Sequence, residues 1–178
     1  MKLGIFLVLF GERSLEEALD FVKSAGVQAV EIGTGGYPGT RHVNAREVVD
    51  DAAAIARIRD AVESRGLTIS ALSCHGNPLH PDKATAQSYH EDFVATVKLA
   101  QKLGVDTVIT FSGCPGESPN SRHPSWVTCA WPPDYLEVLE WQWNEVAIPY
   151  WKEQSAFCRE HGVKVAIESH PGFLVYNT

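Results

Sequence analysis

Paired cysteine motifs are absent from this sequence. Only four of its 178 residues are cysteines, no two of them share a CxxC spacing, and they fall in different predicted elements: Cys74, Cys114, Cys129 and Cys158. Without such spacing, reduced thiols are the simplest interpretation. Because disulfides persist mainly in oxidising compartments, we expect a cytoplasmic protein.

A long apolar run is also missing. No stretch reaches the roughly 18 consecutive apolar residues that a membrane-spanning helix needs, so we expect no membrane partner. Residues 1–10 resemble the start of a signal peptide, with one lysine ahead of an apolar run. That run is short, and no small-residue cleavage site follows it. We therefore interpret residues 3–9 as a β-strand.

Positive charge is scarce. The sequence has 15 Lys and Arg against 22 Asp and Glu, which gives a formal net charge of -7. Proteins that bind nucleic acids or anionic membranes usually present a basic face. The charge balance disfavours both partners, and we expect a small-molecule ligand instead.

Short apolar runs alternate with longer amphipathic stretches along the whole chain. Four of these stretches end in a glycine that an apolar run follows at once: Gly26, Gly66, Gly104 and Gly162. This pattern is typical of a helix, a C-cap glycine and then a strand. The predicted strands cover residues 3–9, 27–32, 67–72, 105–111 and 163–167.

Strands that are apolar throughout indicate a parallel sheet covered by helices. An open doubly wound sheet and a (β/α)8 barrel both have this pattern. The turn at residues 10–13 lacks G-x-G-x-x-G, which disfavours the dinucleotide-binding fold. Polar residues follow the strands, as they do at the C-terminal face of a barrel. We predict an α/β fold in which residues 1–178 form one domain with about the first five units of a TIM barrel.

Glu168 is the strongest candidate for a catalytic residue. It ends the apolar run at 163–167, so its carboxylate is expected at the C-terminal face of the barrel. A carboxylate buried there needs a cation, a metal ion or a proton to offset the loss of hydration. A structural ion pair with a basic residue of a neighbouring strand is the alternative.

Three further residues follow or end strands. His75 lies in a Gly- and Pro-rich loop after the third strand, where an imidazole could bind a metal ion, a sugar hydroxyl or a phosphate. Glu31 ends the second strand and His170 follows Glu168 closely; both are candidates for binding substrate hydroxyls. Each also has a purely structural alternative: a loop hydrogen bond, an ion pair or simple exposure.

The long segment 114–134 is rich in Pro, Ser and Trp. Because it exceeds the usual length of a βα connection, we expect it to have a function. Trp126 and Trp131 lie within it and are candidates for contact with a sugar ring. The tryptophans further along the chain are expected to pack a helix or a subunit interface.

Three segments of the chain resemble the sugar phosphate isomerase/epimerase family, the xylose isomerase-like TIM barrels. They are Ala29-Val30-Glu31-Ile32-Gly33, the run from Ser70 to Pro81 (SALSCHGNPLHP) and Val165-Ala166-Ile167-Glu168-Ser169-His170-Pro171. The resemblance implies a divalent metal (Mn2+, Mg2+, Co2+ or Zn2+) at the C-terminal face. Glu168 matches the metal ligand that ends the fifth strand, and it would also transfer a proton in an epimerase. The other usual ligands end strands six to eight, for which the sequence has no counterpart.

The resemblance implies a metal-dependent isomerase or epimerase acting on a sugar or sugar phosphate. Two alternatives are an endonuclease IV-like metal phosphodiesterase, which the net charge disfavours, and a non-catalytic half-barrel for sugar binding or assembly. Because a full barrel needs roughly 200 to 250 residues, we expect this chain to be the N-terminal part of a longer enzyme. Otherwise it would complete its sheet with another chain, for example in a homo-oligomer.

Overall fold

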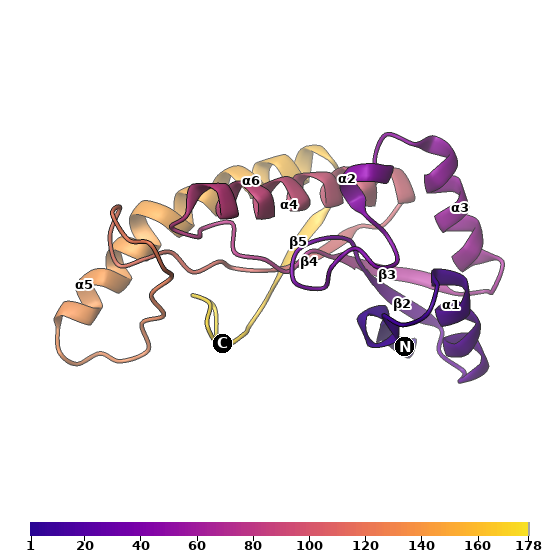
Figure 1. Ribbon diagram of the computed structural model, residues 1–178, viewed down its shortest axis with the longest axis horizontal. Helices are drawn as coiled ribbons and strands as arrows, with labels where there is room; N and C mark the ends of the chain where they lie inside the picture. Colours follow the sequence, from indigo (N-terminus) through magenta and orange to yellow (C-terminus); the bar gives the residue numbers. More distant parts are fainter. Residues whose placement is uncertain (178) are drawn as a thin grey trace.

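The computed structural model describes residues 1–177 and contains a five-stranded parallel sheet (Figure 1). The strands pair in the order of the sequence, β1-β2-β3-β4-β5, with no reversal. Sequential order is that of a barrel, whereas a doubly wound sheet reverses direction at a switch point. The strands are β1 (Gly4–Phe6), β2 (Ala29–Gly33), β3 (Thr68–Ser73), β4 (Thr107–Phe111) and β5 (Lys164–Glu168).

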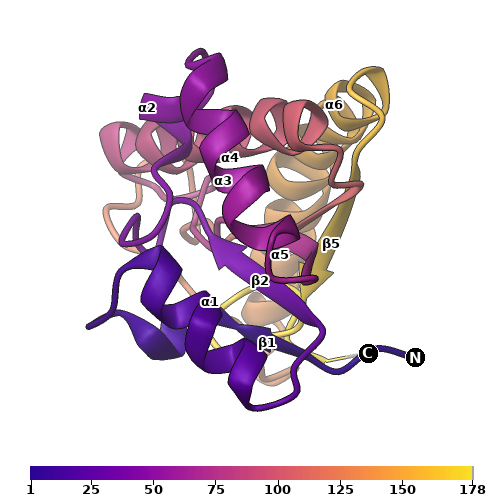
Figure 2. The same ribbon diagram turned by 90° about the vertical axis from the view of Figure 1, so that its right-hand side faces the viewer.

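The helices connect these strands, and α3, α4 and α6 lie on the same side of the sheet (Figures 1 and 2). The α-helices are α1 (Leu15–Ser24), α2 (Ala45–Val48), α3 (Ala52–Glu63), α4 (Lys83–Leu103), α5 (Asp134–Trp141) and α6 (Ile148–Glu160). A 3-10 helix, η1 (Leu7–Phe10), follows β1, and a π-helical turn, η2 (Gln142–Ala147), joins α5 to α6.

Local sequence accounts for the helix ends. Ser14 caps α1 in a capping box with Glu17, and the carboxylate of Asp51 accepts hydrogen bonds from the first backbone N–H groups of α3. The four glycines predicted to close helices, Gly26, Gly66, Gly104 and Gly162, have positive φ angles of 79°, 67°, 76° and 68°. This conformation suits glycine because it has no Cβ, so the predicted C-caps are confirmed.

The hydrophobic core lies between the sheet and these helices. Val30, Ile32, Leu72 and Val108 are fully buried in it, together with helical residues such as Phe93. Since successive strand residues point to opposite faces, the residues between them, including Glu31, point away from the helices. The other face is open at β5: Lys164, Ala166 and Glu168 are exposed there, while Val165 and Ile167 are partly buried on the helical side. The sheet therefore presents Glu31 and Glu168 on its uncovered face.

Some predicted boundaries were wrong. The first strand ends at Phe6 rather than at residue 9, because residues 7–10 form η1 and bury Leu7 in the core. The sequence also gave no sign of the short helix α2. Pro149 lies in the first turn of α6, directly after η2.

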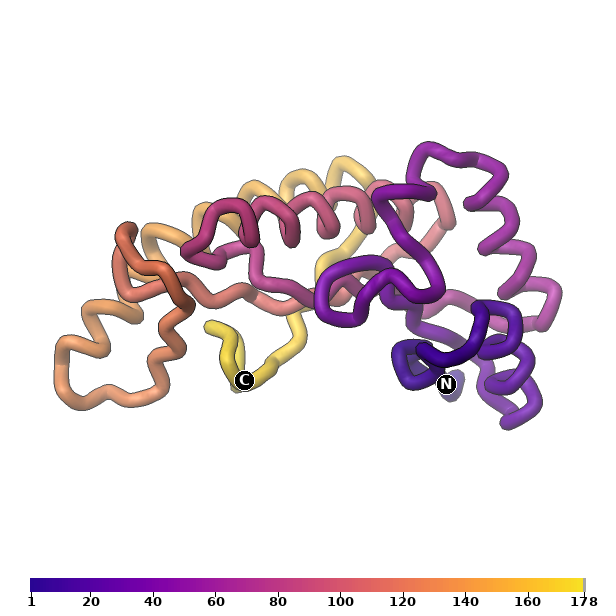
Figure 3. The backbone as a smooth tube through the Cα atoms, viewed as in Figure 1, coloured from indigo at the N-terminus to yellow at the C-terminus, as the bar shows by residue number. Residues whose placement is uncertain are grey.

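Two segments lie outside the β/α pattern (Figure 3). The first, which we call the arm, comprises residues 112–141 and extends away from the sheet. The second is the stretch after β5, which bends back so that the N–H of Leu174 donates to the carbonyl of Gly113, at 3.0 Å. Within the described residues, no helix has both the length and the apolar character needed to cross a lipid bilayer.

Candidate functional site

The carboxyl ends of β3 and β5 bring His75 and Glu168 together. Nε2 of His75 lies 2.8 Å from Oε2 of Glu168. A carboxylate can only accept a hydrogen bond, so Nε2 is the donor, and the other ring nitrogen is left as an acceptor when the imidazole is neutral. His75 is 4% exposed, whereas the side chain of Glu168 is 50% exposed. A buried imidazole thus orients a carboxylate that remains accessible.

The loop after β2 helps to fix the position of His75. The backbone N–H of Tyr37 donates to the carbonyl of His75 at 2.7 Å. Gly36 has a φ of 67°, and a Cβ at this position would lie 2.0 Å from the same carbonyl oxygen. Any side chain at position 36 would therefore push this loop away from His75.

Glu31 is the second carboxylate of the site. It is half-buried on β2, and burial raises the pKa of its carboxyl group above the ordinary value. A hydrogen bond from Ser73 and the charge of His75 lower this pKa, while the negative charge of Glu168 raises it. Glu31, His75 and Glu168 thus lie near one another, at the carboxyl ends of β2, β3 and β5.

An aromatic wall, which we define as Tyr37, Phe111 and Phe173, borders this group. The ring centroid of Phe111 lies 4.5 Å from that of His75 and 4.3 Å from that of Phe173. Tyr37 lies 6.2 Å from both phenylalanines. We did not foresee these residues, although Phe111 could have been found because it ends β4 and pairs with Glu168 in the sheet.

His170 also belongs to this region. Its ring lies 4.6 Å from Phe111, and its side chain is exposed. Nδ1 of His170 is 2.7 Å from the carbonyl oxygen of Pro171, so one ring nitrogen has a local partner. The residue is therefore located where it could contact a ligand bound beside the aromatic wall.

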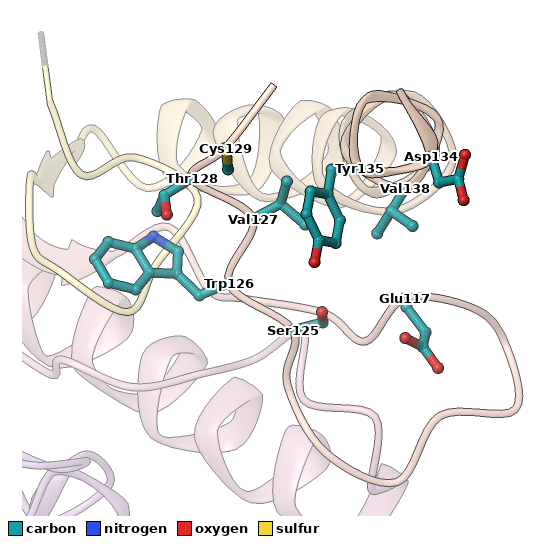
Figure 4. A pocket seen from close by; sticks show the side chains of 9 residues that line it. All are labelled: Glu117, Ser125, Trp126, Val127, Thr128, Cys129, Asp134, Tyr135 and Val138. Carbon is teal, nitrogen blue, oxygen red and sulfur yellow. The ribbon is translucent and has the colours of Figure 1, made fainter. Parts of the chain in front are cut away.

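The two candidate tryptophans lie elsewhere, in the arm. The Trp126 ring packs edge-on against Tyr176 at 5.5 Å, and Trp126 lines a separate cavity (Figure 4). Trp131 is 74% exposed. The structure does not bring either of them to the His75–Glu168 pair, and their contact with a substrate stays a prediction.

The donor set fits only part of a metal site. Among residues 1–177, no group of three or more His, Cys, Asp or Glu side chains is arranged to hold a metal ion. Glu168 suits a ligand because it is half exposed and His75 engages only one of its two oxygens. Divalent metals need at least four ligands, so Glu168 and its neighbours could supply only a fraction of a coordination shell.

Comparison with known proteins gives a family match and a relative for this chain. Residues 19–178 match the family described as Xylose isomerase-like TIM barrel. The chain is 36% identical over 180 residues to the uncharacterized protein YfiH of Bacillus subtilis (strain 168), a match that covers 99% of this chain and 57% of YfiH. The chain therefore spans little more than half the length of this relative.

Solved structures show the same fold. A putative xylose isomerase from Rhodospirillum rubrum superimposes with a TM-score of 0.67 at 17% identity, over 97% of this chain and 56% of that one. The IolI protein with a bound zinc atom superimposes with a TM-score of 0.61 at 16% identity, over 98% of this chain and 54% of that one. For an L-ribulose 3-epimerase the TM-score is 0.56 at 17% identity, over 97% of this chain and 50% of that one. The predicted resemblance is confirmed, and the chain belongs to the xylose isomerase-like TIM barrel family.

Proposed function

We propose that this chain carries part of the active site of a metal-dependent isomerase or epimerase that acts on a sugar or sugar phosphate. The observation that supports this most directly is the hydrogen bond between His75 and Glu168 at the carboxyl ends of two strands. In TIM-barrel enzymes, catalytic residues come from the ends of several strands at this face. Epimerases and isomerases among the structural relatives support the same reaction class.

Each residue has a distinct part in this proposal. Glu168 binds the metal and exchanges a proton with a substrate carbon, and His75 fixes its orientation by donating from Nε2. Glu31, half-buried on β2, binds a substrate hydroxyl. The aromatic wall packs against the apolar face of the sugar and excludes water from the reacting carbon.

The metal would be Mn2+, Mg2+, Co2+ or Zn2+, held by Glu168 and by ligands from outside the described residues. When bound, it supplies a Lewis acid that polarises the sugar carbonyl and so eases removal of the neighbouring proton. Orientation of the Glu168 carboxylate by His75 follows the general rule that hydrogen-bonded partners of a ligand tune metal sites.

The first experiment measures Mn2+ binding by calorimetry to the enzyme with its other metal ligands in place, as the wild type and as Glu168→Gln. We expect the substitution to weaken binding by at least about tenfold, because it removes a charged ligand. Glu160→Gln, at the exposed end of α6, makes the same change in net charge and should leave binding unaltered. Equal binding by Glu168→Gln and wild type would contradict the metal role.

A second measurement addresses the reaction itself. Incorporation of solvent deuterium next to the carbonyl of a panel of ketoses and ketose phosphates should be lost in Glu168→Gln and in the presence of EDTA. Activity that survives both would contradict the proposal. If no divalent cation binds and thermal stability is unchanged by metal, the half-barrel binding module is favoured. Salt-dependent binding of abasic DNA would instead favour the phosphodiesterase.

A further inference from the structure

The arm contains a cavity that is separate from the site at Glu168. Its volume is about 430 Å³, which is within the range of small-molecule sites. Loop 117–129 forms one wall and the first turns of α5 form the other (Figure 4). Glu31, His75, Glu168 and the aromatic wall do not line it. The cavity is therefore a candidate binding site of its own.

The walls of this arm cavity combine an apolar surface with a few polar groups. The ring of Tyr135 extends from α5 toward Ser125 in the loop, and Val127 and Val138 lie beside it (Figure 4). The carboxylate of Glu117 lies across the gap from Val138 (Figure 4). Tyr135 is 47% exposed, so its ring is available to a ligand. A ligand of this cavity would have an apolar body and at least one polar group.

The charge of the arm cavity has one sign. Glu117 and Asp134 line it, and its lining residues include no Lys, Arg or His. Neither carboxylate forms an ion pair within residues 1–177. Two such carboxylates repel an anion, including a phosphorylated sugar. The face of an aromatic ring also attracts cations.

The loop wall is held in place by hydrogen bonds, one of them fully buried. Gln142 is fully buried, and its Nε2 donates to the carbonyl oxygens of Gly116 at 2.9 Å and Ser125 at 2.7 Å. The hydroxyl of Ser121 accepts from the N–H of Glu117 at 3.1 Å. Gln142 begins the π-helical turn η2, a feature that is frequent at functional sites. A wall held in this way loses little entropy when a ligand binds.

We propose that the arm cavity binds a small organic cation, a primary or substituted ammonium group on an apolar body. The ammonium group lies beside the Glu117 carboxylate, and the apolar body packs on Tyr135, Val127 and Val138. Asp134 at the rim adds to the negative potential. The proposal does not depend on the reaction at Glu168, because Glu31, His75, Glu168 and the aromatic wall do not line the arm cavity.

The test uses benzylamine, which is a cation at pH 7, and benzyl alcohol, a neutral molecule of nearly the same shape. Binding is followed by NMR through the indole N–H of Trp126, which lines the cavity and is assigned with Trp126→Phe. We expect benzylamine to shift this resonance and to bind at least about threefold more tightly than benzyl alcohol, as one partly exposed charge interaction implies.

Two variants localise the charge effect. Glu117→Gln should weaken benzylamine binding by about three- to tenfold and leave benzyl alcohol binding unchanged. Glu137→Gln removes an equal charge from α5 at an exposed position that does not line the cavity, and it should change neither. The proposal is overturned if the Trp126 resonance does not shift, if both ligands bind equally, or if the two variants weaken benzylamine equally. Thermal melts of both variants verify that they are folded.

Discussion

At the scale of single residues, His75 and Glu168 are 93 positions apart in the sequence yet share a hydrogen bond. Both could be identified from the sequence because each follows an apolar run, and parallel strands end at one edge of the sheet. Two of the three aromatic-wall residues, Tyr37 and Phe173, could not be found in this way. Tyr37 and Phe173 reach the site on loops, and nothing in the local sequence predicts how those loops fold back.

Glu31 gives a prediction about pH. Its pKa is raised in the folded protein, so between the ordinary and the raised pKa the folded state binds more protons than the unfolded state does. The contribution of Glu31 to the free energy of unfolding is fully present when the pH is below its pKa in the unfolded state. This contribution is lost as the pH rises through its pKa in the folded state. Glu31→Gln should remove this decrease, so that the variant loses less stability between pH 4 and pH 7 than the wild type.

Urea unfolding of both proteins at several pH values would measure this difference. Glu47→Gln is a suitable control, because Glu47 is exposed on α2 and its substitution removes the same negative charge. If Glu31→Gln and Glu47→Gln have the same pH profile, the inferred environment of Glu31 is wrong.

At the scale of elements, the connection between β4 and β5 was the least predictable part of the fold. Its length and its Pro and Trp content indicated a special role, but not the π-helical turn η2. Gln142, at the start of η2, forms hydrogen bonds with loop carbonyls 17 to 27 residues earlier in the chain. The spacing of apolar residues in the sequence does not predict such contacts, whereas it did locate α1, α3 and α4.

Gln142→Leu should therefore destabilise the protein. The buried amide donates to the carbonyls of Pro115, Gly116 and Ser125, and leucine would leave these oxygens without that donor. We expect a loss of about 1–3 kcal/mol in the free energy of unfolding. Chemical denaturation measures this loss, and limited proteolysis should show faster cleavage within the arm.

Gln101→Leu is a matched control, because Gln101 is exposed near the end of α4. Its effect on stability should be within about 0.5 kcal/mol. A Gln142→Leu variant that is as stable as this control would mean that Gln142 does not hold the arm.

At the scale of the whole molecule, the sheet has one covered face and one open face, and β5 lies at its edge. The alternation of helices and strands was sufficient to predict the covered face. The open face follows from the sequential strand order, since only a closed barrel would enclose Glu31 and Glu168. The proposed active site thus lies on the uncovered face of the sheet.

The edge of the sheet gives the last prediction. The N–H of Lys164 donates to the carbonyl of Asp106, at 2.7 Å, so this side of β5 faces β4. Because N–H groups alternate along a strand, those of Ala166 and Glu168 also point to β4, while those of Val165 and Ile167 point away from the sheet. In a monomer of this chain, hydrogen exchange at Val165 and Ile167 should be at least about tenfold faster than at Ala166.

Exchange is measured residue by residue by NMR, with size-exclusion chromatography to establish the oligomeric state. Ala166 and Val165 are neighbours in one strand, so local sequence and overall stability affect both and the comparison is internally controlled. Equal protection at Ala166, Val165 and Ile167 would show that another segment pairs with β5. If protection at Val165 then rises with protein concentration, that segment belongs to a second copy of the chain, because only association between molecules depends on concentration.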